Sequence, residues 1–379
     1  MHWYGSLTKN YIAATGRIVQ CPAPYDRTGT FNVMNVDYDP IPTNFDNTMN
    51  FEDCCIDRGN YLWSKEKPIT LYWSGGIDST TALTSLLLTQ PKGADLKVVL
   101  TVESIAENNS YYEKIKSTVD LEIIESTKSA LYDSKRFYGD SVLVNGECGD
   151  PTFGTFVVQN HVEELDKDWK CLFDWDDQFF NKGESLFAGR ISDLHDFIEF
   201  CEKYIALCPF EVRTTFDFTW WLAFALKWQW IDRRFLGNVD YTLGWRNLYS
   251  FFNNQEFQKW SIVHHDKKHK GTWKTYKWPA KEFIYKYNPD RDYLENKTKE
   301  TSIPRAVGLS VVQNPTYKLI MNDGRAYRVG EPIMDLSKWN VLNYDTFVRD
   351  FNAQIQLEQD VDHEVAWKPQ PRWNTSIPV

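Results

Sequence analysis

Three features of the sequence predict an α/β fold. Short apolar segments alternate with amphipathic ones between residues 68 and 144, glycine turns follow two of the apolar segments, and the overall composition is that of a globular protein. The chain has 379 residues, of which 42% are hydrophobic and 25% are charged. Strands and helices that alternate with short connections predict a parallel sheet with helices on both faces. We expect a mostly helical region to follow this sheet.

The predicted elements follow one another from residue 69. We expect strands at 69–73, 98–102, 121–125 and 142–144, and helices at 79–88, 108–116 and 128–138. Ligands of such sheets bind beyond the carboxyl ends of the strands. The turns that follow the first and the fourth strand are therefore the expected place for a functional site.

The rest of the chain is organised around this core. Residues 1–65 have little hydrophobic periodicity and many turn-forming residues, which predicts an irregular or β-containing N-terminal segment. We expect the α/β core at 66–165 and a helical region at 166–320, where aromatic stretches such as 219–228 form mostly core. Residues 321–379 are expected to contain the end of a β-hairpin centred on Asn322-Asp323-Gly324, a helix near 344–357 and an extended tail.

Composition narrows the class of protein. A formal net charge of −10 makes a large nucleic-acid surface unlikely. The seven cysteines include no CxxC pair, which favours reduced thiols over a zinc ribbon or a disulfide framework. No apolar run approaches the length of a membrane span, and the first residues lack the pattern of a signal peptide. We therefore expect a cytoplasmic protein that does not act at a membrane.

The turn after the first strand has the features of a phosphate site. Its residues are Ser74-Gly75-Gly76-Ile77-Asp78-Ser79. Glycines let the backbone approach an anion closely, and the unpaired N–H groups at the start of a helix point toward it. A carboxylate beside a phosphate, here Asp78, is favourable when Mg²⁺ bridges the two. The alternative is a turn that merely caps the helix, but capping needs one Ser or Asp rather than this whole set.

The turn after the fourth strand carries two more carboxylates. Residues 145–154 read NGECGDPTFG, with Glu147 and Asp150 in the turn. Both turns belong to the same edge of the predicted sheet, so Asp78 and Asp150 are candidate ligands of one Mg²⁺ ion. The alternative is a polar loop whose glycines serve only to reverse the chain.

These two turns resemble those of a known superfamily. The first resembles the SGGxDS signature of the PP-loop ATP pyrophosphatases, which cleave ATP between its α and β phosphates, and no Walker A motif is present. The second resembles the GEGADELFGG segment of class B asparagine synthetases, β-lactam synthetases and lasso-peptide cyclases. Cys148 replaces a Gly of that segment and Pro151 replaces a Glu. The resemblance implies an adenine nucleotide α-hydrolase-like fold.

The resemblance also implies roles for individual residues. ATP would bind through Ser74, Gly75, Gly76, Asp78 and Ser79, with adenine near the backbone of Tyr72, Leu100 and Gly146, and Mg²⁺ on Asp78 and Asp150. Glu147 would be a catalytic carboxylate that contributes to the reaction after ATP has bound. Residues 248–257 resemble the family's PFLD helix start, with Asn253 in place of Asp. The family's catalytic lysine follows this segment, and by spacing it corresponds to Lys297, with Lys299 as the alternative. His264, His265 and His269 lack a carboxylate or Cys at ligand spacing, so we expect surface residues there.

The activity implied by the resemblance is that of an AMP-forming carbon-nitrogen ligase of the asparagine synthetase type. Such an enzyme adenylates a small-molecule carboxylate and transfers it to an amine or ammonia, with release of AMP and pyrophosphate. Position 2 is His2, and fewer than 70 residues precede the first predicted strand, so no glutaminase domain is expected. The nitrogen would come from ammonia, from an amino group of the substrate, or from a separate donor protein.

Two other functions stay open at this point. One is a PP-loop enzyme that modifies a nucleobase or a transfer RNA, which the acidic net charge disfavours. The other is a catalytically inactive PP-loop protein that serves as an interaction partner.

Overall fold

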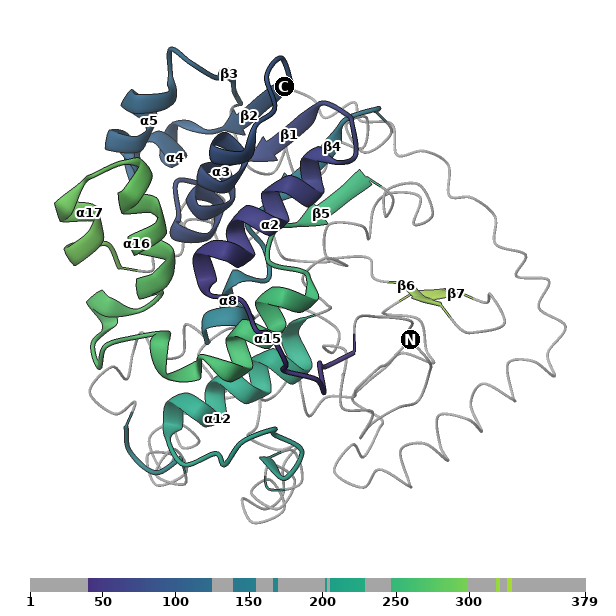
Figure 1. Ribbon diagram of the computed structural model, residues 1–379, viewed down its shortest axis with the longest axis vertical. Helices are drawn as coiled ribbons and strands as arrows, with labels where there is room; N and C mark the ends of the chain where they lie inside the picture. The colour runs from purple at the N-terminus through teal and green to yellow at the C-terminus, as the bar shows by residue number, and fades with distance from the viewer. Residues whose placement is uncertain are drawn as a thin grey trace, which may run out of the picture.

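The computed structural model in Figure 1 describes residues 40–124, 139–154, 166–169, 202, 205–228, 247–298, 318–320 and 326–328. The helices predicted at 128–138 and 344–357, the tail and Lys299 lie outside these residues. No helix within the described ranges is long and apolar enough to cross a membrane.

A five-stranded parallel sheet forms the centre of the fold, which confirms the predicted α/β class. The strands are β1 (Ile69–Tyr72), β2 (Leu96–Leu100), β3 (Asp120–Ile123), β4 (Val142–Asn145) and β5 (Leu248–Ser250), and their order in the sheet is β3-β2-β1-β4-β5. Leu71 of β1 lies opposite Val98 on one side and Val144 on the other. Runs of apolar residues with little alternation are typical of such central parallel strands. The architecture is compatible with a nucleotide α-hydrolase-like fold.

The predicted bounds of the second strand are wrong by two residues. Strand β2 ends at Leu100, because Thr101 is the N-cap of a further helix, α4 (Val102–Glu107). The Thr101 hydroxyl accepts a hydrogen bond from the Ser104 amide, and the Ser104 hydroxyl accepts one from the Thr101 amide. This capping box turns the chain out of the sheet where the apolar pattern alone would continue the strand.

Helix α2 (Phe51–Trp63) corrects the expectation of an irregular or β-containing segment at this point of the chain. The many polar residues of α2 obscure its apolar face in the sequence, although Cys54, Cys55 and Leu62 on this face are fully buried. The Asn50 side chain caps the helix by accepting a hydrogen bond from the Asp53 amide. The neighbouring helix, α3 (Ile77–Thr89), follows the glycine turn, and α2 and α3 lie side by side over the sheet (Figure 1).

Helix α3 is rich in hydroxyl side chains and yet buried. Thr81 and Thr84 donate hydrogen bonds to backbone carbonyls one turn earlier, at 2.8 Å each. Ser85 donates to the Cys55 carbonyl of α2 at 2.6 Å. The hydroxyls therefore satisfy their own hydrogen-bonding capacity, and the small side chains let two helices pack closely.

The part of the chain that follows the first four strands is mostly helical, as predicted. Its described helices are α8 (Gly149–Phe153), α12 (Thr215–Leu222), α15 (Gln255–Val263), α16 (Trp278–Tyr287) and α17 (Arg291–Asn296), and α5 (Asn109–Ile115) precedes them. Trp220, Trp221 and Trp228 are buried, as expected for core aromatics. Helix α16 packs against α3. The chain from 166 onward also supplies β5, which was not predicted because a three-residue strand has too short a pattern to recognise.

Long-range contacts join these parts. The Arg58 guanidinium of α2 donates hydrogen bonds to the Phe251 and Ser250 carbonyls at the end of β5, each at 2.9 Å. The rings of Phe51 and Trp260 have centroids 4.9 Å apart.

The hairpin predicted around Asn322 is confirmed by two antiparallel strands, β6 (Lys318–Ile320) and β7 (Ala326–Arg328).

Candidate functional site

The glycine turn after β1 is held in one conformation by its own side chains and by α4. Gly75 has φ +76°, and a Cβ there would lie 2.3 Å from the Ser104 carbonyl oxygen, so only glycine fits. The hydroxyls of Ser74 and Ser79 lie 2.9 Å apart, and the Ser79 hydroxyl accepts a hydrogen bond from the Ser74 amide. The N-cap of α3 is Gly76, which has no side chain to cap it. No side chain of this turn caps α3 through its N-cap residue, which weakens the interpretation of the turn as a mere cap.

The turn after β4 packs directly onto the first. A Cβ at Gly149 would lie 2.4 Å from the Asp78 carboxyl carbon, so the absence of a side chain at this position makes room for that carboxylate. Cys148 begins α8 in the left-handed conformation, with φ +66°. Glu147 is half-buried, and its amide donates to the Asn145 side chain at 3.0 Å. Residues from the ends of β1 and β4 thus form one continuous surface at the carboxyl edge of the sheet.

Asp78 and Asp150 converge on the ammonium group of Lys277. The Lys277 Nζ lies 2.6 and 2.5 Å from the two Asp78 carboxylate oxygens and 2.9 Å from Asp150 Oδ1. The Lys277 side chain is completely buried, while 14% of Asp78 and 18% of Asp150 is exposed. A buried ammonium is tolerated when opposite charges surround it. The structure therefore brings the two carboxylates together, and the cation between them is the Lys277 ammonium; their predicted role as Mg²⁺ ligands stays a prediction.

Lys277 was not among the residues that we predicted. It is the N-cap of α16 and adopts φ +57°, a conformation that is uncommon for a residue with a side chain. A cation at the start of a helix is also unfavourable, because the helix dipole is positive there. The Pro279 that follows marks a helix start in the sequence, so a lysine just before it is the signal that could have pointed to a special role.

Two neighbouring side chains hold the Lys277 segment. The Tyr276 hydroxyl donates to the Gly154 carbonyl at the end of α8, at 2.8 Å. The Lys281 ammonium donates to the Lys274 carbonyl and, at 3.2 Å, to the Lys297 carbonyl. Burial lowers the pKa of Lys281 to about 8. These contacts connect the start of α16 with α8 on one side and with the end of α17 on the other.

Lys297, the predicted catalytic lysine, lies beside the glycine turn rather than at the aspartate pair. Its Nζ is 3.4 Å from Glu107 Oε1 and 3.4 Å from the Glu107 carbonyl oxygen. Glu107 itself borders the turn, because a Cβ placed on Gly76 would lie 3.4 Å from its Oε1. Lys297 therefore belongs to the same edge of the sheet, but it is paired with a glutamate that was not predicted.

The three backbone positions predicted to contact adenine also lie at this edge. Tyr72 and Leu100 are the last residues of β1 and β2, and Gly146 is the first residue after β4. The Leu100 carbonyl already accepts a hydrogen bond from the Ile124 amide, at 2.9 Å. An adenine contact at Leu100 would therefore have to use the second lone pair of this oxygen or the amide.

The donor set fits Mg²⁺ bound together with a phosphate ligand. Within the described residues, no group of three or more His, Cys, Asp and Glu side chains is arranged to hold a metal ion. Mg²⁺ is commonly bound by one or two carboxylates, with phosphate oxygens and water completing its octahedron. The Asp78–Asp150 pair, which already surrounds a cation next to the start of α3, provides this partial set.

No family is identified. The sequence matches neither the models of known protein families nor any of the curated proteins with which it was compared.

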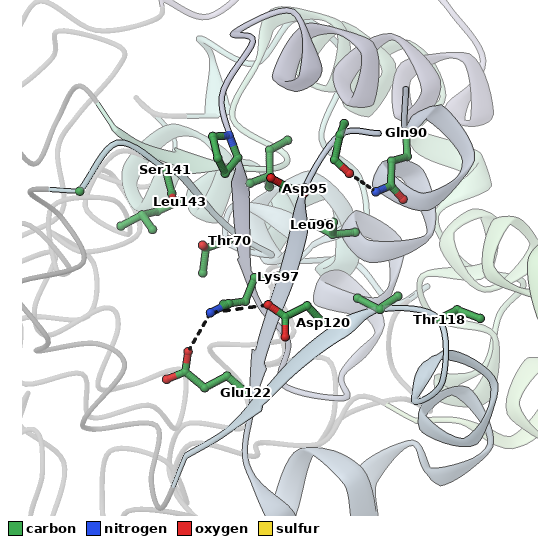
Figure 2. Close-up of a pocket in the computed structure, with 15 residues that line it drawn as sticks. Thr70, Gln90, Asp95, Leu96, Lys97, Thr118, Asp120, Glu122, Ser141 and Leu143 are labelled. Carbon is green, nitrogen blue, oxygen red and sulfur yellow. Dashed lines mark hydrogen bonds and ion pairs between the residues drawn. The ribbon is translucent and has the colours of Figure 1, made fainter. Parts of the chain in front are cut away.

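A cavity of about 600 Å³ lies at the other end of the strands. Its lining includes Thr70 near the start of β1, Leu143 of β4, and Lys97 of β2 with its ion-pair partners Asp120 and Glu122 (Figure 2). Ligands of parallel α/β sheets bind at the carboxyl ends of the strands, whereas this cavity lies toward their amino ends. We therefore place the candidate site at the two turns and not in this cavity.

Of the three histidines expected at the surface, His265 differs from that expectation. His265 is largely buried, and its Nε2 lies 2.8 Å from Asp217 Oδ1 while its Nδ1 lies 2.7 Å from the Lys268 Nζ. Burial and the nearby Lys268 charge lower the pKa of His265 to about 3. The neutral imidazole can thus accept from the ammonium and donate to the carboxylate. This is a buried polar chain between α12 and the end of α15 rather than a surface cluster.

Proposed function

We propose that the protein is an ATP-dependent, AMP-forming ligase that adenylates a small-molecule carboxylate and transfers it to an amine or ammonia. The observation that carries the proposal is the meeting of Asp78 and Asp150 around one cation, next to the uncapped start of α3. A helix start offers N–H groups and a positive dipole to phosphates. The SGGxDS motif distinguishes this site from the Walker A loop of enzymes that cleave at the γ-phosphate.

In this proposal each group has a distinct role. The amides and hydroxyls of the glycine turn hold the pyrophosphate portion of ATP, and Asp78 and Asp150 hold Mg²⁺. When bound, Mg²⁺ neutralises negative charge on the departing pyrophosphate. The buried ammonium of Lys277 lies within the same cluster and supplies a positive charge to phosphate oxygens. We assign Glu147, which follows β4, and Lys297, which pairs with Glu107 beside the glycine turn, to the part of the site that would hold the carboxylate and amine substrates.

The chemistry consists of two substitutions. A carboxylate oxygen attacks the α-phosphorus, and the bond to the bridging oxygen breaks so that pyrophosphate leaves with the electron pair. The amine then attacks the acyl carbon, AMP leaves with the electron pair of the C–O bond, and the amine loses a proton to a base. Holding the reactants in line at a site that is already polar supplies much of the rate enhancement. Glu147 is the residue that we propose as the proton acceptor.

Isotope exchange between pyrophosphate and ATP tests the proposal. Wild type and Asp78→Asn would be assayed with Mg²⁺ and pools of amino acids, other small carboxylates, or RNA. We expect exchange that requires a carboxylate and is lost in Asp78→Asn, because this change removes half of the cation site. Circular dichroism would show that the variant is folded. Undiminished exchange in Asp78→Asn would contradict the assigned metal site.

The same assay separates the two alternatives. Exchange that requires RNA would favour a nucleobase-modifying enzyme and overturn the ligase proposal. Absence of exchange in every pool, together with no binding of Mg·ATP by calorimetry, would favour an inactive interaction protein.

A further inference from the structure

We propose that Lys277 acts as an internal cation that keeps free divalent metal ions out of the Asp78–Asp150 pair and lets the metal bind only together with a polyphosphate. The proposal rests on the proposed function for the identity of the ligands. It adds a residue, and an order of binding, that neither the motif nor the resemblance to synthetases implied.

The geometry makes Lys277 and a metal ion competitors for the same oxygens. The ammonium is 2.5 to 2.9 Å from three carboxylate oxygens of the two aspartates. A Mg²⁺ ion would need these oxygens at about 2.0 to 2.1 Å. A metal ion bound between the same carboxylate oxygens would lie almost in contact with the ammonium, and the repulsion between the two positive charges excludes their joint occupancy. The ammonium has to move aside before a metal ion is bound by both aspartates.

The charges decide when this movement is favourable. Two carboxylates and one ammonium leave a single negative charge in a largely buried cluster. A divalent ion that arrives alone would create an excess of positive charge, and it would leave the displaced ammonium without a partner of opposite sign. A polyphosphate removes both penalties, since its oxygens complete the metal coordination and accept hydrogen bonds from the ammonium.

The surrounding structure allows the ammonium to move while its backbone stays in place. Lys277 starts α16, and its neighbour Tyr276 is anchored by a hydrogen bond to the Gly154 carbonyl. Lysine has a flexible four-carbon stem and three rotatable donors. The side chain can therefore pass from the aspartates to a phosphate bound at the start of α3 without a change in fold.

Binding measurements without any carboxylate or amine substrate test this inference. Mn²⁺ would replace Mg²⁺ as a probe visible by electron paramagnetic resonance, and inorganic pyrophosphate would be titrated by calorimetry. The variant is Lys277→Met. The control is Lys274→Met, three residues earlier, whose ammonium contacts Asn296 outside the cluster. Thermal unfolding would verify that both variants are folded.

The expected effects of Lys277→Met have opposite signs. Mn²⁺ alone should bind about tenfold more tightly than to wild type, because the competing ammonium is gone. Pyrophosphate in the presence of Mn²⁺ should bind about tenfold more weakly, because its cationic partner is gone. Lys274→Met should leave both affinities unchanged. A purely structural role for Lys277 would instead weaken both, and that result would overturn the inference.

Wild-type protein provides a second measurement if Lys277→Met does not fold. Pyrophosphate should raise the affinity for Mn²⁺ by about tenfold, and Mn²⁺ should raise that for pyrophosphate by the same factor. Independent binding of the two would overturn the inference. If the wild type binds neither pyrophosphate nor ATP, both the proposed function and the polyphosphate part of this inference are contradicted. A gain in Mn²⁺ affinity in Lys277→Met would even then show that the lysine excludes the metal.

Discussion

Two residues at the candidate site adopt a backbone conformation that usually requires glycine. Cys148 has φ +66° at the start of α8, and Lys277 has φ +57° at the start of α16. Left-handed conformations of residues with a Cβ are costly and often accompany functional sites. The Cys148 side chain compensates in part by filling a fully buried position.

We predict that Cys148→Gly is more stable than Cys148→Ala by about 1 kcal/mol. Both changes remove the buried sulfur, but only glycine relieves the left-handed conformation. Urea denaturation of the two variants measures the difference. Cys55, also fully buried but inside helix α2, is the matched control, and there alanine should be more stable than glycine by about 1 kcal/mol. If the same one of the two variants, glycine or alanine, were the more stable at both positions, the proposed strain at Cys148 would be contradicted.

At the level of elements, the polar chain from Asp217 through His265 to Lys268 joins α12 to the end of α15. Asp217 accepts hydrogen bonds from the Thr214 and Arg213 amides as well as from His265. Burial alone would raise its pKa, but these hydrogen bonds outweigh burial and lower it to about 2. Lys268 is fully buried, and its ammonium lies 3.7 Å from the centre of the Trp220 ring. Burial places the pKa of Lys268 well below its usual value.

This chain predicts a loss of stability in acid. The pKa of His265 falls from 6.5 to about 3 on folding, so between these values the unfolded chain binds a proton that the folded protein does not. The free energy of unfolding should therefore decrease as the pH falls, by about 1.4 kcal/mol per pH unit near pH 5. Asp217 adds to the loss only below its ordinary pKa of 3.8.

Urea denaturation at pH 7, 6 and 5 checks this dependence. His265→Gln should flatten the slope, because glutamine does not titrate. His264→Gln is the neighbouring control and should keep most of the slope, since His264 is far less buried and its pKa is lowered to a smaller extent. Equal slopes in wild type and His265→Gln would contradict the assignment to His265.

At the level of the whole molecule, segments before and after the α/β core in the sequence share its sheet and its hydrophobic core. Strand β5 comes from residues 248–250, yet it pairs with β4. Phe153 packs against Trp260 of α15 at 5.3 Å between ring centroids, and Phe51 of α2 packs against both. The α/β core at 66–165 is therefore completed by residues on either side of it in the sequence.

We predict that a fragment of residues 66–165 does not fold alone, whereas residues 40–298 do. The shorter fragment lacks α2, β5, α15 and α16, and so exposes the aromatic core and one edge of the sheet. Cooperative urea unfolding and near-ultraviolet circular dichroism of the two fragments measure this. A cooperative transition in 66–165 would show that the core is an independent domain.

Local signals in the sequence were sufficient for β1, the glycine turn and α3. These elements depend on backbone preferences within about fifteen residues: a short apolar strand, two glycines and a helix rich in hydroxyl residues. Such local preferences can be recognised in the sequence without knowledge of the fold. The carboxyl edge then brings Asp78 and Asp150 together, because parallel strands end on the same side. Helix α2 was missed since its buried face is made of Cys and Arg as well as apolar residues.

The sequence by itself thus determined the parallel α/β class, the glycine turn and the pair of aspartates that faces it. Only the tertiary structure decided which cation lies between them. Lys277 is 199 residues from Asp78 in the sequence. It lies between the aspartates, and Lys297 does not, because α16 packs against α3 and the buried ammonium and carboxylates neutralise one another. Such long-range compensation has no period and no local motif, because it arises only when distant segments exclude water from the same space.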